Sequence, residues 1–79
     1  MDFEEIDRVD ATTLSKGDIV SVVNDYSEGK REEFLQVTGP VDDDNSGVLV
    51  YPAHNLSTGE DEDAFIVDEW DTVAIYRSY

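Results

Sequence analysis

The chain has no cysteine, one histidine, two prolines and only five lysines and arginines in 79 residues. Without cysteine, neither a disulfide nor a thiolate zinc site is available to stabilise so small a domain. No apolar run approaches the roughly 18 residues that a membrane-spanning helix needs. Residues 1–5 are acidic, whereas a secretory signal would be basic and then apolar. We therefore expect a soluble, cytoplasmic protein without a membrane partner.

The residues that usually carry enzymatic chemistry are also scarce. His54 follows Pro52 beside a turn, a position typical of a solvated histidine rather than of a general base. No carboxylate lies in an apolar stretch that would raise its pKa into a working range. We predict that the protein is not an enzyme and that it uses no cofactor.

Acidic residues, by contrast, are abundant: 20 Asp and Glu give a net charge of -15. High charge with low hydrophobicity is typical of disorder, but 39% of the residues are apolar and we expect a folded domain. At molar salt the Debye length is about 3 Å, so carboxylate repulsion is screened while the surface stays hydrated. The excess of Asp over Glu, with acid in every loop, resembles proteins of extremely halophilic microbes. A different interpretation is an acidic mimic of nucleic acid that occupies a basic partner.

Short strands separated by turns make up most of the pattern. Gly17 and Asp18 predict a turn, because glycine supplies a positive φ and aspartate a local side-chain hydrogen bond. β-Branched residues follow, with Val20 and Val22 on the expected core face. Residues 68–71 suit a single 3₁₀ turn, and residues 25–32 a polar loop. The five predicted strands cover residues 18–24, 33–38, 48–51, 64–67 and 73–76.

The N-terminal residues 1–13 have a different pattern. Phe3, Ile6 and Val9 recur at three-residue spacing, which favours a short helix. A loosely docked tail is the alternative. We therefore divide the chain into an N-terminal helix or tail, residues 1–13, and one domain, residues 14–79.

The order and spacing of the predicted strands resemble a small SH3-like barrel. Lys16-Gly17-Asp18 followed by Val20 and Val22 is similar to the first strand of translation-associated barrels of the KOW type. The resemblance implies an all-β fold with five antiparallel strands and a 3₁₀ turn before the last. Together with the scarcity of catalytic residues, this leads us to expect a monomeric, non-enzymatic binding or accessory module.

Aromatic residues with polar neighbours are the leading candidates for a binding surface. We predict that Tyr26, Tyr51 and Trp70 form an exposed groove beside the loop at residues 25–32, unless Trp70 plugs the end of the barrel. SH3-like barrels that bind peptides use such a groove for extended proline-rich segments, with acidic residues beside it. A protein or peptide is therefore the expected partner.

Two other segments contain residues of the kinds that contact nucleic acid or metal ions. Lys30 and Arg31, near Tyr26, would combine a phosphate contact with base stacking in a nucleic-acid-associated barrel, although the surrounding glutamates favour a local ion-pair cluster. Asp42 and Asp44 match the first half of an EF-hand loop, but its twelfth position is Ala53 rather than glutamate. We therefore predict a solvated loop and no metal site there.

Overall fold

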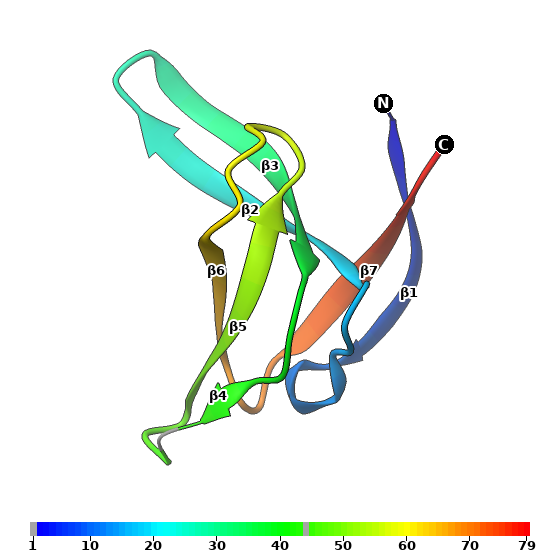
Figure 1. Cartoon of the computed structure of the whole chain (residues 1–79), viewed down its shortest axis with the longest axis vertical. Coiled ribbons are helices and arrows are strands. Elements are labelled where there is room, and N and C mark those ends of the chain that lie inside the picture. The colour runs from blue at the N-terminus through cyan, green and yellow to red at the C-terminus, as the bar shows by residue number, and fades with distance from the viewer. Residues whose placement is uncertain (1, 44) are drawn as a thin grey trace.

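Residues 2–43 and 45–79 are described by a computed structural model, in which they form an antiparallel sheet of seven strands and a single 3₁₀ helix (Figure 1). The elements are β1 (Phe3–Asp10), η1 (Ala11–Thr13), β2 (Ile19–Tyr26), β3 (Gly29–Val37), β4 (Asp42–Asp43), β5 (Val48–Asn55), β6 (Asp63–Asp68) and β7 (Thr72–Ser78). The strand order is β1-β7-β2-β3-β5-β4, and β6 lies off this path, paired with β5. The described residues include no helix with the length and apolar character that a membrane crossing requires.

The turn that leads into β2 has the predicted conformation. Gly17 has a φ of +98°, in the left-handed region that glycine adopts without steric cost. The Asp18 carboxylate accepts a hydrogen bond from the Ser15 amide at 2.8 Å. Val20 and Leu35, opposite each other in β2 and β3, are both buried. The predicted turn and the core face of the strand that follows it are confirmed.

The predicted N-terminal helix is wrong, because residues 3–10 form β1 along the edge of β7. The register shifts between Glu5 and Asp7, so Ile6 is an extra residue, as in a β-bulge. Residues opposite each other lie on the same face of a sheet. Phe3 therefore lies on the face of its partner Ser78, and Val9 on the other face with Val73. A bulged strand thus produces the three-residue spacing that suggested a helix.

The predicted loop over residues 25–32 is the outer part of a long hairpin instead. β2 continues to Tyr26, β3 begins at Gly29, and a two-residue turn joins them. Asp25 and Lys30 are directly opposite, as an oppositely charged cross-strand pair. Figure 1 shows this hairpin extending away from the other strands. Because both of its faces meet solvent, polar residues occupy both, and the alternation that marks a half-buried strand disappears.

The core is formed by alternate residues of five strands and by η1. Phe34 lies on the opposite face of β3 from the core residues Leu35 and Val37. Its ring stacks on Phe3 with a centroid distance of 4.0 Å and meets Tyr76 edge-on at 5.2 Å. A second, aromatic cluster therefore holds β1 and β7 against β3. The main core consists of Ala11, Leu14, Val20, Leu35, Val37, Leu49, Tyr51, Ala53, Phe65, Val73 and Ile75.

The all-β prediction is confirmed, but the expected five-stranded barrel is not, because the sheet has seven strands and is not closed. In the part of the chain described, β6 pairs with β5 alone. The Asp71 amide donates to the Asp68 carbonyl at 3.1 Å, which is the contact of the predicted turn before the last strand. The 3₁₀ helix itself lies elsewhere, at Ala11–Thr13.

Candidate binding site

The three aromatic residues predicted to form one groove lie in three different environments. Tyr26 is exposed at the end of β2, in the projecting hairpin. Tyr51 is only 1% exposed, and its hydroxyl donates to the Ala11 carbonyl at 2.6 Å. Trp70 is 73% exposed in the turn between β6 and β7, and its ring lies over the Gly47 backbone. These residues therefore form no continuous surface.

Tyr51 serves the fold instead. Its ring fills the middle of the core, and its hydroxyl joins β5 to η1, which connects β1 to the chain before β2. Burial raises the pKa of the Tyr51 phenol above its ordinary value, because the ionised form would lose its hydration.

The predicted cationic pair lies in the projecting hairpin. The Arg31 guanidinium forms an ion pair with Glu28 at 2.7 Å and lies 5.3 Å from the centre of the Tyr26 ring. Lys30 is opposite Asp25. Arg31 thus pairs with one of the neighbouring glutamates, and Lys30 has an aspartate as its cross-strand neighbour. Arg77 belongs to a different region, since it pairs with Glu4 between β7 and β1.

The EF-hand-like segment has strand geometry at its start. Asp42 belongs to β4 and lies opposite Val50, and Asp44 falls outside the described residues. The Asp43 carboxylate accepts the Asn45 amide at 2.9 Å, as in an Asx-turn. Among the described residues, no group of three or more His, Cys, Asp or Glu side chains is arranged to hold a metal ion.

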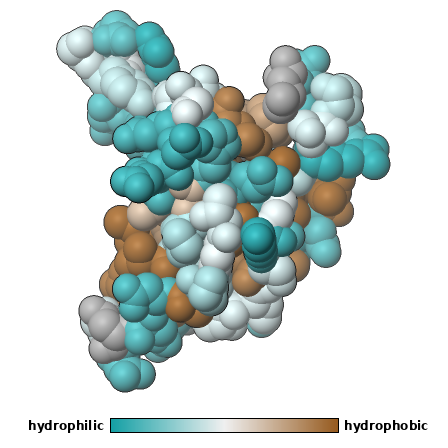
Figure 2. Space-filling model, viewed as in Figure 1, coloured by the Kyte–Doolittle hydropathy of each residue, from teal (hydrophilic) through white to brown (hydrophobic). Residues whose placement is uncertain are grey.

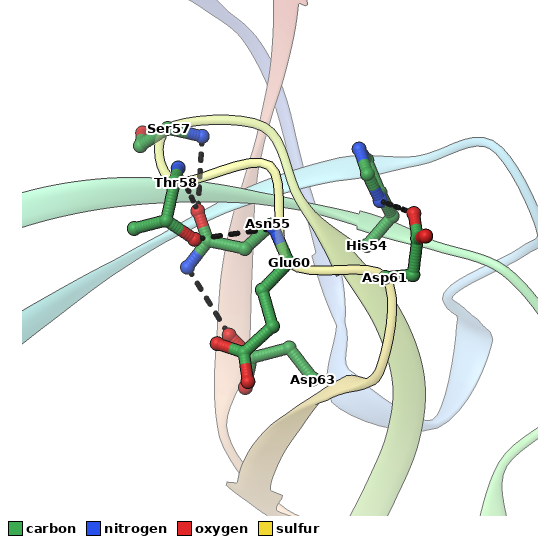
Figure 3. A network of polar contacts seen from close by, with 7 residues as sticks. All are labelled: His54, Asn55, Ser57, Thr58, Glu60, Asp61 and Asp63. Atoms are coloured by element: carbon green, nitrogen blue, oxygen red, sulfur yellow. Dashed lines mark hydrogen bonds and ion pairs between the residues drawn. The ribbon is translucent and has the colours of Figure 1, made fainter.

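A polar network that the sequence did not reveal closes one end of the core (Figure 3). Its centre is Asn55, the last residue of β5, which is 2% exposed. The side-chain oxygen Oδ1 of Asn55 accepts hydrogen bonds from the backbone amides of Ser57 and Thr58 at 2.9 and 3.0 Å. Its side-chain nitrogen donates to Glu33 and to Asp63, both at 3.1 Å. One asparagine thus connects the loop after β5 to both β3 and β6.

Glu33 is the buried charge of this network, with 3% exposure. It accepts hydrogen bonds from the Tyr26 hydroxyl, from Asn24 at 2.8 Å and from Asn55. These bonds, led by the one from Tyr26, lower the pKa of Glu33 against the opposing effect of burial. The same contact raises the pKa of Tyr26, because the phenol must keep its proton to donate it. The projecting hairpin is therefore held to the core by an ionised carboxylate.

Two hollows meet at the beginning of β6, beside this network. The larger, of about 520 Å³, is lined both by small or apolar residues and by carboxylates. The smaller, of about 210 Å³, lies between β2, β3 and β6. Asp63 and Ala64 line both. The larger is lined by Thr38, Pro52, Ala53, Asp61, Glu62, Asp63 and Ala64, and the smaller by Val22, Asn24, Leu35, Asp63, Ala64 and Ile66.

The surface around these hollows combines exposed apolar residues with acid. Ile66 and Val48 are exposed on β6 and β5, and Figure 2 shows hydrophobic residues on the β6 side of the molecule with hydrophilic residues above and below them. The His54 imidazole lies 3.0 Å from Asp61, in the loop beside the larger hollow (Figure 3). We call the two hollows and β6 between them the β6 surface.

Glu33 and Asn55 continue the alternation of core residues along their strands, which is the sequence feature that indicates their burial. Leu49, Tyr51 and Ala53 alternate along β5 as core residues, and Asn55 is the next member of that series.

Comparison with models of known protein families, with curated protein sequences and with solved structures finds no match to this chain.

Proposed function

We propose that this protein is a non-enzymatic module that binds an extended, basic segment of another protein at the β6 surface. The observation that carries the proposal is the lining of the larger hollow, where Pro52 and Ala64 supply apolar contact and Asp61, Glu62 and Asp63 supply negative charge. A segment with apolar side chains flanked by lysine or arginine complements both features.

The distribution of positive charge supports this choice. Neither hollow is lined by a lysine or an arginine among the described residues. The arginines make their contacts on other strands: Arg8 with Thr72, Arg31 with Glu28 and Arg77 with Glu4. A basic ligand at the β6 surface would therefore meet acid without a competing lysine or arginine.

Catalysis fits these residues less well. The buried carboxylate of Glu33 has a lowered pKa, whereas a general acid or base works best with a pKa near the operating pH. Among the described residues, the exposed Asp61 carboxylate is the one that lies within ion-pair distance of His54. A nucleic-acid contact through Lys30 and Arg31 has less support as well, because Arg31 is already engaged by Glu28 and Tyr26.

Binding is tested by NMR titration of the isotope-labelled protein with a short peptide of alternating valine and threonine that has an arginine at each end. We expect the largest amide shifts at residues 61–68. A peptide with glutamate in place of both arginines is the ligand control. No shift with the basic peptide, or shifts confined to the hairpin at residues 24–31, would reject this site. Displacement of DNA from a basic protein, without peptide binding, would point to nucleic-acid mimicry.

A charge-matched pair of variants separates local from global attraction. Asp61→Asn with Glu62→Gln removes two negative charges from the larger hollow. Glu5→Gln with Asp25→Asn removes two exposed charges from β1 and the hairpin. We expect only the first pair to weaken binding by about tenfold, a loss equivalent to about 1.4 kcal/mol. Equal weakening by both pairs would mean that binding depends on net charge alone.

A further inference from the structure

The two long edge strands of the open sheet differ in how they are protected. β1, at one edge, has five charged residues among its eight and contains the bulge at Ile6. Charges and bulges are the devices by which sheet edges avoid pairing with other chains. The edge at β1 is therefore protected against pairing with a strand of another chain.

β6 has neither device. Its sequence is Asp63-Ala-Phe-Ile-Val-Asp68, so its four inner residues are uncharged, and its register with β5 runs without a shift. The Ile66 side chain is 65% exposed. Within the described residues β6 pairs only with β5, which leaves one edge of its backbone without a strand partner. An edge of this kind is a template for another strand.

The smaller hollow lies beside this edge. Val22 and Leu35 contribute its apolar part from β2 and β3, and Ala64 and Ile66 contribute the β6 side. A strand added to β6 would place alternate side chains toward this hollow, because successive residues of a strand point to opposite faces. The hollow of about 210 Å³ thus offers space for an apolar side chain of the added strand.

We infer that β6 binds its partner by strand addition: an extended segment pairs with the free edge of β6 through backbone hydrogen bonds and places an apolar side chain in the smaller hollow. The inference rests on the proposed function and specifies its mode. Asp63 and Asp68 stand at the two ends of β6, so the segment it fits has apolar residues in the middle and a basic residue near each end.

A second copy of this chain is a poorer occupant. If two β6 strands paired antiparallel about a two-fold axis, Asp63 of each would lie opposite Asp68 of the other. Like charges directly opposite each other destabilise a strand pair. The net charge of -15 on each copy adds further repulsion. The ends of β6 therefore favour a basic foreign strand over self-pairing.

Backbone methylation of the arginine-ended peptide tests the mode directly. Two versions are compared, one N-methylated at its odd amides and one at its even amides. Strand addition predicts that one version loses at least about tenfold in affinity and that the other stays within about twofold of the parent, because only one set of amides faces β6. Equal affinities would overturn strand addition while leaving the proposed function intact. Equal losses would also contradict it, and failure of the parent peptide to bind would reject the proposed function itself.

Two isoleucines supply the matched variants. Ile66 in β6 and Ile6 in β1 are both exposed on edge strands, at 65% and 53%. Ile66→Lys and Ile6→Lys change the net charge equally, and circular dichroism checks that both fold. We expect Ile66→Lys alone to weaken peptide binding by about tenfold or more. Equal effects would reject β6 as the binding edge. Sedimentation of the protein without peptide gives the remaining outcome, since a dimer that Ile66→Lys dissociates would identify a second copy as the occupant.

Discussion

Replacing Asn55 with alanine is expected to be the most damaging single change outside the apolar core. Asn55 is 2% exposed and makes four side-chain hydrogen bonds, two of them to carboxylates. A hydrogen bond to a charged group contributes about 1.5–3 kcal/mol. The Ser57 and Thr58 amides belong to exposed residues and regain water, so their share is smaller. We therefore expect Asn55→Ala to lower the free energy of unfolding by about 3 kcal/mol.

The expected loss is large for a chain of this size. Domains have a free energy of unfolding of about 0.05–0.15 kcal/mol per residue, so 79 residues correspond to roughly 4–12 kcal/mol. A loss of 1 kcal/mol lowers the melting temperature of such a domain by about 4–8 °C. Urea denaturation followed by circular dichroism, at one fixed salt concentration, measures the change. An effect below about 1 kcal/mol would refute the view that Asn55 holds this end of the core.

Asn55→Asp provides a sharper version of the same test. It keeps the shape and the acceptor oxygen but replaces the donor that faces Glu33 and Asp63 with a third carboxylate. At neutral pH we expect Asn55→Asp to be less stable than Asn55→Ala, because like charges would then meet in a buried site. The difference between the two variants should shrink on acidification, because protonation of the introduced aspartate removes its charge and restores a hydrogen-bond donor. Equal stabilities at neutral pH would mean that donation to the two carboxylates is unimportant.

Three further predictions concern the hairpin, a turn and the charge. The contact between Glu33 and Tyr26 lowers the folded pKa of Glu33 and raises that of Tyr26, so its stabilising effect is complete between pH 4.5 and pH 10. Stability should fall on acidification through the folded pKa of Glu33 and on raising the pH through that of Tyr26. Tyr26→Phe should flatten both limbs of a plot of urea midpoint against pH, and unchanged limbs would contradict the assignment. Gly59→Ala should lower the free energy of unfolding by about 1–2 kcal/mol, because the position has a positive φ. Gly47→Ala should lower it further, because its φ is also positive and the new methyl group would lie 3.2 Å from the Trp70 ring. Equal shifts of the melting temperature would contradict the contact with Trp70. If the acidic surface is an adaptation to salt, the melting temperature should rise between zero and about 2 M KCl, and an unchanged value would remove the basis of that proposal.

Local signals were enough to predict the strands that border the core. The turn at Gly17 and Asp18 is specified by its own residues, and the apolar alternation at Leu35 and Val37 assigns their face. The hairpin between β2 and β3 lacked such a signal, since it projects beyond the core and has no apolar face to alternate. Its geometry follows from the two-residue turn and from cross-strand pairs such as Asp25 with Lys30, which read as loop residues in the sequence alone.

The N-terminal strand was not predictable for a different reason. Every pairing of β1 is with β7, at the other end of the chain. Phe3 and Val9 are apolar on opposite faces, and the bulge at Ile6 removes the even spacing that would mark a strand. Helical periodicity was the only local pattern left, and long-range pairing overrode it.

The candidate site depended on tertiary structure in the same way. Asn55 and Glu33 continue the core alternation of β5 and β3, but a polar residue in phase with a core is equally the first residue of a loop. Asn55 is buried because the neighbouring loop folds back over it, and its backbone N–H donates a hydrogen bond to the Glu60 carbonyl at 2.9 Å. Acid in the loop at residues 60–63 was visible from the sequence, whereas the hollows beside it exist only once β6 and β5 are paired.

The open sheet and the acidic surface are connected. A strand edge without charges or a bulge is ordinarily an aggregation hazard, and β6 is such an edge. Here the repulsion between two chains of net charge -15 opposes self-pairing, and Asp63 facing Asp68 opposes it locally. A basic strand would be attracted both by the net negative charge and by the two aspartates at the ends of β6. On the proposed mode of binding, the same charge that opposes pairing between two copies of β6 would favour a partner of opposite sign.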